Sequence, residues 1–240
     1  MRLNIFLACT SYSNGWPEQE RNSMKSILVI GIGKFGHHFA EKLIALGNEV
    51  MIIDQDEDKI RELMSKATSA RIGDCTDEDV LNNLGLSNFD TVAVCISEDF
   101  QNSIETTSLV KELGAKHVIS VASRDIHAKL LLKNGADEVI YPDRDIAYRL
   151  AKKCSRSHVF EYIELSDEYA IFEVPVIPQL VGKSIREADV RKKYKMNIIG
   201  IVHGEDVQIM PSADYRFSSD EHIKVISDND SVDAYLKHVK

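Results

Sequence analysis

Short apolar runs recur between residues 26 and 141, and amphipathic stretches separate most of them. The runs predict strands at 27–30, 49–53, 69–72, 90–96, 117–121 and 138–141. After the first run, Phe35, Phe39 and Leu43 recur at the three- and four-residue spacing of one helical face. Because strands and helices alternate in this way, we expect an α/β fold with a Rossmann-like, doubly wound parallel sheet.

The pattern changes after Pro142. Residues 143–156 predict a helix, and later apolar runs predict strands at 160–165, 170–174, 197–202, 207–210 and 222–226, with one helix near 184–193. Mixed short elements of this kind indicate a small α+β domain of about 80 residues. We therefore expect an N-terminal lobe over 24–143, a connecting helix over 144–160 and a C-terminal lobe over 161–240.

Residues 1–23 fit neither lobe. An apolar stretch at 5–9 is too short for a secretory signal, and mostly polar residues follow it. Met24 directly precedes the first predicted strand. We interpret 1–23 as a disordered extension, the product of a start codon assigned too far upstream. The alternative is a lipoprotein-like signal that ends at Cys9.

Composition narrows the classes of partner. The chain is 44% hydrophobic and 28% charged, as is usual for a globular protein. Its formal net charge of −9 argues against nucleic acid as a main partner, because phosphate binding needs a basic face. Four cysteines lack metal-binding spacing, and Cys75 and Cys95 are interpreted as small buried residues in a reducing compartment.

The first predicted strand ends in Gly31-x-Gly33-x-x-Gly36, and the second ends in Asp54. This combination is typical of dinucleotide-binding folds. The first glycine allows a tight turn, the second admits phosphate to the backbone, and the third lets the helix pack closely. The helix N-terminus offers N–H groups to phosphate, and Asp54 can accept hydrogen bonds from a ribose. The alternative is a glycine-rich turn with nothing bound.

Other candidate contacts stand at the strand ends, where doubly wound sheets bind their ligands. They are Lys34, Phe35, Asp74, Cys75, Thr76, Ser97 and Arg124. Lys34 and Arg124 can face phosphate oxygens, while Asp74 and Thr76 can meet a base or ribose. Simpler alternatives are that Asp74-Cys75-Thr76 caps the next helix and that Arg124 pairs with Asp125 or Glu98.

One feature suggests an enzyme. Tyr148-x-x-x-Lys152 has the spacing of the catalytic pair in short-chain dehydrogenases. Their activating serine precedes the tyrosine by about a dozen residues, where this chain has Gly135 and Ala136, and their glycine signature differs. We therefore expect Tyr148 and Lys152 to be neighbours on an exposed helical face and the protein not to be an enzyme. A small NAD-dependent oxidoreductase is the alternative.

Together, the motifs resemble the KtrA/TrkA-type regulatory proteins of bacterial potassium uptake, which are built from RCK (regulator of potassium conductance) domains. The matching segments are 30–36, 50–54, 73–77, 92–97, 135–143, 162–169, 182–185 and 191–194. The resemblance implies an RCK N-lobe that binds ATP, ADP or NAD(H) without turning it over, and an RCK C-lobe. It also implies a homodimer that assembles into an octameric ring. That ring would be cytoplasmic, peripheral to the membrane through a potassium-translocating subunit of KtrB/TrkH type.

The same resemblance implies roles for particular residues. Asp54 would hold the ribose, and Lys34 would lie beside the terminal phosphates, where family members often carry arginine. Asp143 stands where KtrA proteins carry a glutamate that helps to bind a divalent or monovalent cation beside the nucleotide. Related C-lobes bind cyclic di-AMP at a dimer interface, and the corresponding lining residues here are Ile185, Arg191, Asn197, Ile198 and Pro211.

Overall fold

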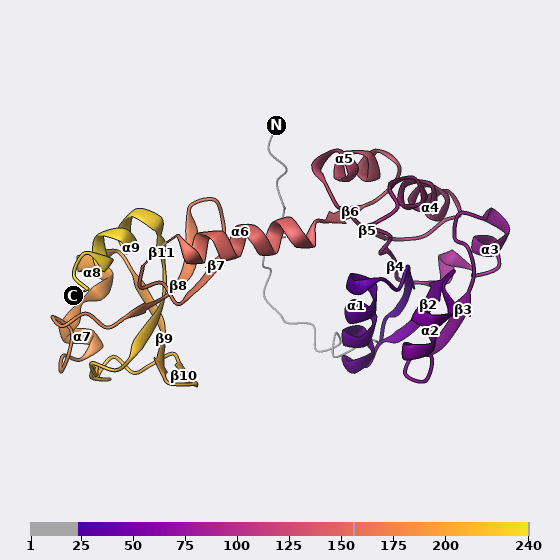
Figure 1. The fold of residues 1–240 in the computed structure, drawn as a ribbon. Helices are drawn as coiled ribbons and strands as arrows, with labels where there is room; N and C mark the ends of the chain where they lie inside the picture. Colours follow the sequence, from indigo (N-terminus) through magenta and orange to yellow (C-terminus); the bar gives the residue numbers. More distant parts are fainter. Residues whose placement is uncertain (1–23, 156, 240) are drawn as a thin grey trace, which may run out of the picture. The chain divides into compact units, whose positions relative to one another are not determined.

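The computed structural model describes residues 24–155 and 157–239, and the interpretation of residues 1–23 therefore lies outside the described residues (Figure 1). The chain divides into two compact units between Tyr141 and Pro142. No helix in the described part of the chain is both long and apolar enough to cross a membrane.

The N-terminal unit contains a parallel sheet of six strands in the order β3-β2-β1-β4-β5-β6. The strands are β1 (Ser26–Ile30), β2 (Glu49–Asp54), β3 (Ser69–Ile72), β4 (Thr91–Val94), β5 (Val118–Val121) and β6 (Glu138–Ile140). The central strand β1 is apolar and buried almost throughout, because helices cover both faces of the sheet (Figure 1).

Alternate residues of β1 enter two different cores. Leu28 and Ile30 pack with Val110 and its neighbours on one face, while Val29 packs with Ala40 and Ile60 on the other. The helices of this unit are α1 (Lys34–Ala45), α2 (Glu57–Leu63), α3 (Glu78–Asn82), η1 (Leu86–Asn88), α4 (Phe100–Glu112) and α5 (Asp125–Lys133). The predicted doubly wound sheet is confirmed.

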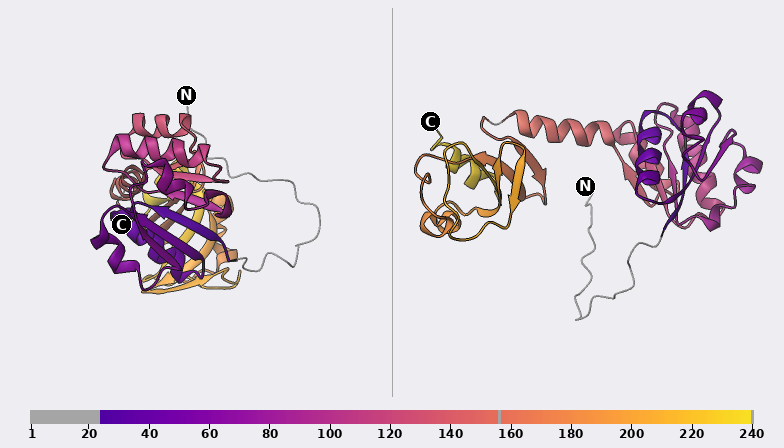
Figure 2. Two further views of the ribbon diagram at one scale, coloured as in Figure 1. Left: turned by 90° about the vertical axis from the view of Figure 1, so that its right-hand side faces the viewer. Right: turned by 90° about the horizontal axis from the view of Figure 1, so that it is seen from below.

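The C-terminal unit begins with α6 (Pro142–Cys154), which Figure 2 shows as one uninterrupted helix. An antiparallel sheet follows, in the order β10-β9-β11-β8-β7. Its strands are β7 (Glu161–Glu164), β8 (Tyr169–Pro175), β9 (Asn197–His203), β10 (Asp206–Ile209) and β11 (His222–Asp228). Phe172, Val225 and Tyr235 are fully buried in the core of this unit. The predicted α+β character of the second domain is likewise confirmed.

One helical prediction was wrong in this unit, and one helix was not predicted. The single helix near 184–193 is two short helices, α7 (Ile185–Ala188) and α8 (Val190–Tyr194), because Asp189 between them has a left-handed φ of 45°. The helix α9 (Asn229–Leu236) was not expected. Asp228 caps it by accepting a hydrogen bond from the Ser231 N–H group, and Tyr235 anchors it in the core.

Candidate functional site

The order of the parallel strands reverses between β1 and β4, so the loops that follow these strands leave the sheet in opposite directions. Gly31 turns the chain out of β1 with a φ of 87°, and its N–H group donates to the Ile53 carbonyl at 2.9 Å. A Cβ at Gly31 would lie 3.0 Å from Cγ1 of Ile96, in the loop after β4. Glycine is therefore required where the two loops meet.

The other two glycines of the motif have different surroundings. A Cβ at Gly36 would lie 2.0 Å from the Gly31 carbonyl oxygen, so the first turn of α1 packs directly on the glycine turn. A Cβ at Gly33 would meet nothing within 4 Å. Gly33 is the N-cap of α1 and has no side chain to bond the N–H groups of the first turn. These N–H groups, together with Lys34, suit a phosphate.

Asp54 ends β2 and is buried, with 9% of its surface exposed. Its Oδ2 accepts a hydrogen bond from the Ile32 N–H group at 2.6 Å, and its Oδ1 accepts one from Asp56 N–H at 2.9 Å. The carboxylate thus holds the glycine loop to the end of β2. Each carboxylate oxygen can accept a second hydrogen bond, so both retain capacity for ribose hydroxyls.

The loop after β3 contains a local turn. Asp74 Oδ1 accepts hydrogen bonds from the N–H group of Thr76 at 2.9 Å and from its hydroxyl at 2.8 Å. Asp77, rather than Asp74, caps α3. Cys75 is buried, and burial together with the nearby charges of Asp74 and Asp54 raises the pKa of its thiol to about 12. Cys75 is therefore an inert apolar contact that lies close to both carboxylates, not a nucleophile.

Lys34 and Phe35 open α1 but have different environments. The Lys34 side chain is exposed. Phe35 is partly buried, stacks on Phe39 with 5.6 Å between ring centroids, and packs against the core. Since the Phe35 ring belongs to this packing, its backbone N–H group is the part that suits a phosphate.

Ser97 and Arg124 follow β4 and β5, which are neighbouring strands. Ser97 is half-buried in the loop that leads to α4. The guanidinium carbon of Arg124 lies 4.6 Å from the ring centroid of Phe100, the first residue of α4. Sequence reasoning missed Phe100 and the adjacent buried His127. The only signal was an aromatic residue directly after the acidic residues that follow β4.

The remaining sequence candidates lie on α6. Asp143, in its first turn, is exposed. Tyr148 is 63% exposed, while Lys152 Nζ donates to Glu164 Oε2 at 2.6 Å and lies 5.3 Å from the Tyr162 ring centroid. Among residues 24–155 and 157–239, no cluster of three or more histidine, cysteine, aspartate or glutamate side chains is arranged to hold a metal ion.

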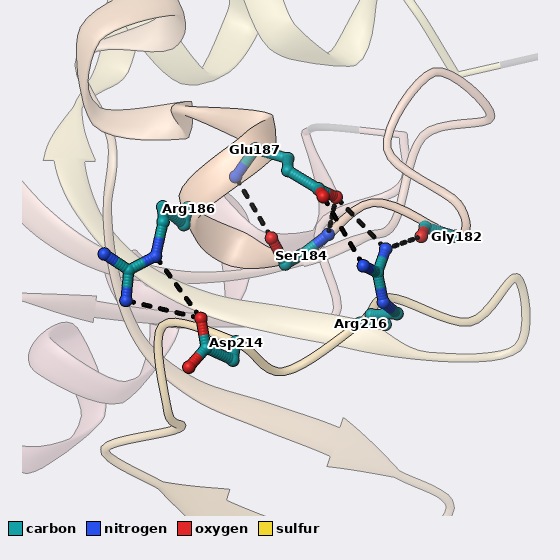
Figure 3. A network of polar contacts seen from close by, with 6 residues as sticks. All are labelled: Gly182, Ser184, Arg186, Glu187, Asp214 and Arg216. Atoms are coloured by element: carbon teal, nitrogen blue, oxygen red, sulfur yellow. Dashed lines mark hydrogen bonds and ion pairs between the residues drawn. The ribbon is translucent and has the colours of Figure 1, made fainter.

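In the C-terminal unit, a polar network fixes the segment before α7 to the segment 212–217 (Figure 3). Ser184 and Glu187 form a reciprocal cap, and Arg216 donates to the Glu187 carboxylate at 3.1 Å and to the Gly182 carbonyl at 2.7 Å. Arg186 pairs with Asp214 at 3.3 Å on the other side (Figure 3). The Ser184 N–H group and Arg216 hold the pKa of Glu187 below its ordinary value.

The predicted cyclic di-AMP residues lie in or near the two segments that this network joins. Ile185 begins α7, is partly buried, and its N–H group donates to the Tyr215 carbonyl at 2.9 Å. Arg191 is exposed on α8. Asn197 is exposed at the start of β9, and Ile198 beside it packs on the core. Pro211 is half-buried after β10.

A cavity of about 580 Å³ lies elsewhere in the C-terminal unit. It is lined mainly by the end of α6, which includes Lys152, the segment after it and α9, and it shares no residue with the candidate nucleotide or cyclic di-AMP contacts. Asn229 lines it and carries a buried Oδ1 atom without a hydrogen-bond partner in the described part of the chain. The candidate nucleotide contacts lie instead at the carboxyl ends of the strands of the parallel sheet.

Comparison with known proteins gives the same division of the chain. The TrkA-N domain family matches residues 27–142, and the TrkA-C domain family matches residues 169–240. The Ktr system potassium uptake protein C of Bacillus subtilis (strain 168) is 40% identical over 90% of this chain and 97% of its own length. The Ktr system potassium uptake protein A of the same organism is 39% identical over 78% of this chain and 85% of its own.

Among solved structures, the GsuK channel bound to NAD is similar with a TM-score of 0.63 and 19% identity. The similarity covers 94% of this chain and 40% of the channel chain, and it supports the fold alone. The resemblance drawn from the sequence motifs is thus confirmed. This chain belongs to the family of Ktr and Trk system potassium uptake proteins, with a TrkA-N domain followed by a TrkA-C domain.

Proposed function

We propose that this protein is a cytosolic, nucleotide-binding regulatory subunit of a bacterial potassium uptake system. The observation that carries the proposal is the glycine loop at the strand-order reversal, held by buried Asp54, in a chain of the Ktr and Trk family. Nucleotide binding would favour one conformation of the assembly over another. A ligand shifts such an equilibrium only through different affinities for the two states.

The ligand is ATP, ADP or NAD(H), and the site fits such a group. The phosphates would lie at the N-terminus of α1, where Gly33 leaves open space and Lys34 adds positive charge. The ribose would bond to Asp54. Asp74, Thr76 and the buried Cys75 would contact the base or ribose side. Ser97 and Arg124 would contact the end of the nucleotide that is farthest from the base. A structurally similar channel has been solved with NAD bound.

The partner is a membrane potassium-translocating subunit of KtrB/TrkH type, which would hold this protein at the inner face of the membrane. We infer a homodimer that assembles into an octameric ring. In support, none of the thirteen residues of α6, all of them described, is buried, and Ile146 and Leu150, four residues apart on one face, are each more than half exposed. An apolar helix surface of this kind suits contact with a second copy.

Two further ligands belong to this proposal. Asp143 would help to bind a cation beside the nucleotide. Ile185, Arg191, Asn197, Ile198 and Pro211 would line a cyclic di-AMP pocket, for which the network of Glu187 and Arg216 holds the neighbouring backbone in place. Arg191 supplies positive charge for the phosphates and Ile185 an apolar surface for a base.

We propose that the protein does not catalyse a reaction on its nucleotide. Lys152, the partner of Tyr148 in the dehydrogenase-like spacing, is already bonded to Glu164 at 2.6 Å. Purified protein should consume no NADH over hours with a broad panel of carbonyl substrates. Turnover that disappears in Tyr148→Phe would favour an oxidoreductase instead.

The ligand assignment is tested by competition binding of ATP, ADP, NADH and NADPH to the full chain, and by a separate direct titration with cyclic di-AMP. We expect NADH to bind more tightly than NADPH, because the 2′-phosphate of NADPH would meet the Asp54 carboxylate. Tighter binding of NADPH would contradict the placement of the ribose. The Arg191→Ala variant should lose binding of cyclic di-AMP and keep binding of the other nucleotides.

The regulatory role is tested in liposomes that contain the protein together with a potassium-translocating subunit of KtrB/TrkH type. We expect potassium flux under ATP to differ from flux under ADP, with a coupling of roughly 1–3 kcal/mol between nucleotide and gate. Equal flux with either nucleotide and with none, or failure of the two proteins to associate, would contradict the role.

A further inference from the structure

A fully buried histidine lies behind the candidate nucleotide contacts. His127, on α5, has no exposed surface. Its Nε2 lies 3.1 Å from the hydroxyl oxygen of Ser103 on α4, and its Nδ1 lies 3.3 Å from the backbone nitrogen of Ser123. The ring therefore joins α4, α5 and the turn after β5.

The Ser123 contact assigns the tautomer. A backbone N–H group can only donate, so Nδ1 is the acceptor, and Nε2 carries the hydrogen that is donated to Ser103. Burial, with a smaller contribution from the positive charge of Arg124, lowers the pKa of His127, so the ring is neutral at neutral pH. A neutral ring in this tautomer fixes the backbone at Ser123, directly before Arg124.

Phe100 connects the histidine to the arginine. Its ring centroid lies 5.0 Å from that of His127, and the Arg124 guanidinium carbon lies 4.6 Å from the same Phe100 centroid. The exposed Arg124 side chain thus rests on an aromatic surface that the buried histidine supports. The backbone from which Arg124 extends is fixed through His127, and the direction of its side chain is fixed by Phe100.

The location of this arrangement suggests its use. Phe100 begins α4, a few residues after the end of β4, and Arg124 follows the adjacent strand β5. Both strands lie on the side of the sheet away from Asp54. In a doubly wound sheet, a ligand whose ribose bonds at β2 extends its far end over these strands. In ATP, that end is the terminal phosphate.

We propose that His127 is a positioning residue, which together with Phe100 holds Arg124 at the far end of the nucleotide site so that the site distinguishes ligands by their terminal phosphate charge. This inference rests on the proposed nucleotide binding. It names the group that separates ATP from ADP, and it assigns a role to a buried side chain that makes no contact with the ligand.

The test is calorimetric titration of the full chain with ATP, ADP and adenosine. Arg124→Gln should lower ATP affinity about tenfold relative to both ADP and adenosine affinity, since a hydrogen bond to the terminal phosphate is lost. His127→Leu should lower the ATP-to-adenosine ratio similarly, while His127→Asn, whose side-chain oxygen can accept from Ser123 N–H, should restore most of it. The double variant Arg124→Gln/His127→Leu should lose no more than either single variant.

The controls separate this inference from folding and from the proposed function. If His127→Leu does not fold, Phe100→Leu replaces it and should also lower the ratio, while His127→Asn should keep most of it. Equal loss of ATP and adenosine affinity in the His127 and Phe100 variants would indicate a purely structural role and overturn the inference. An unchanged ratio in Arg124→Gln would overturn it while leaving nucleotide binding intact. No binding of ATP or adenosine by the unmodified protein would overturn both.

Discussion

The two units stabilise their key carboxylates in different ways. In the N-terminal unit, Asp54 accepts hydrogen bonds from two backbone N–H groups, those of Ile32 and Asp56. In the C-terminal unit, Glu173 is bonded to the side chains of Lys224 at 2.8 Å and His222 at 3.0 Å. Both carboxylates are largely buried, with 9% of Asp54 and 14% of the Glu173 side chain exposed.

The difference separates a binding group from a structural one. Backbone N–H groups carry no net charge, so these contacts do not pair Asp54 with a cation, and its oxygens can accept further hydrogen bonds from a ligand. Glu173 pairs with the Lys224 cation and accepts a hydrogen bond from His222, and these contacts join β8 to β11. The same contrast extends to the glycine loop, which is built from backbone, and to the segment at α7, which is held by Arg216 and Glu187 (Figure 3).

The largest effect on stability should come from a change in the glycine loop of the N-terminal unit. Gly36→Val would place a Cβ 2.0 Å from the Gly31 carbonyl oxygen, so α1 must move away from the sheet. We expect a loss of about 3 kcal/mol or more in the free energy of unfolding of the N-terminal unit. Urea unfolding followed by circular dichroism measures it.

Gly33→Ala is the matched control, because a Cβ there meets nothing within 4 Å. It should leave the free energy of unfolding nearly unchanged and weaken nucleotide binding, since the added methyl group occupies the space that a phosphate would approach. Equal destabilisation by both changes would contradict the different roles of the two glycines.

Removal of the Asp54 carboxylate tests its role as the binding group. Asp54→Ala should weaken adenosine and ATP affinity by about 1.5–3 kcal/mol, because hydrogen bonds from the ribose are lost together with the contact that fixes the loop. Calorimetric titration gives the value. An unchanged affinity would show that the ribose lies elsewhere.

Glu173→Gln, unlike Asp54→Ala, should affect stability and not nucleotide affinity. It keeps the shape of the side chain and removes the charge that pairs with Lys224 and His222. We expect the C-terminal unit to lose about 1–2 kcal/mol of stability after allowance for solvent screening, with no change in nucleotide affinity. If nucleotide affinity falls as far as in Asp54→Ala, the contrast between the two carboxylates is wrong.

The smallest effect concerns acid sensitivity. The folded-state pKa of His127 is lowered from 6.5, so the unfolded state takes up the proton first and the N-terminal unit begins to lose stability as pH falls below about 6.5. For Glu173, burial raises the pKa, but bonds from Lys224 and His222 outweigh it and lower the pKa from 4.5. Its stabilising contribution is therefore present above about 4.5 and is lost as pH falls through the folded-state pKa.

Hydrogen exchange, corrected for the intrinsic pH dependence, can follow both units in one sample. Protection of α5 should decline at higher pH than protection of β8 and β11. His127→Asn should remove the early decline in α5 and leave the sheet of the C-terminal unit unaffected. A decline at the same pH in both units would contradict the assignment to His127.

Much of the N-terminal unit could be predicted from sequence because its signals are local. The apolar run before Gly31 and the run before Asp54 are a strand-turn-helix-strand pattern that the parallel sheet requires, and the structure places both turns at one edge. The Arg124–Phe100 contact and the burial of His127 could not be predicted. They depend on how α4 and α5 pack, and residues 24–27 apart in sequence carry no periodic signal of contact.

The C-terminal unit was harder for a different reason. Asp189 adopts a left-handed conformation that few residues other than glycine favour, and nothing in its neighbours indicates the break between α7 and α8. The missed helix α9 did carry a signal. Val232, Tyr235 and Leu236 have helical spacing, and Asp228 is a good capping residue, but the sequence analysis predicted no element after the strand at 222–226.

The hydrogen bond between Ile32 and Asp54 also has a consequence for timing. Because the Asp54 carboxylate holds the glycine loop through a hydrogen bond within the chain itself, closing of the loop need not limit how fast a nucleotide binds. Exchange of one nucleotide for another would then be paced by how long the departing molecule stays bound. For a regulator of ion flux, that residence time would set how quickly potassium uptake follows a change in the energy state of the cell.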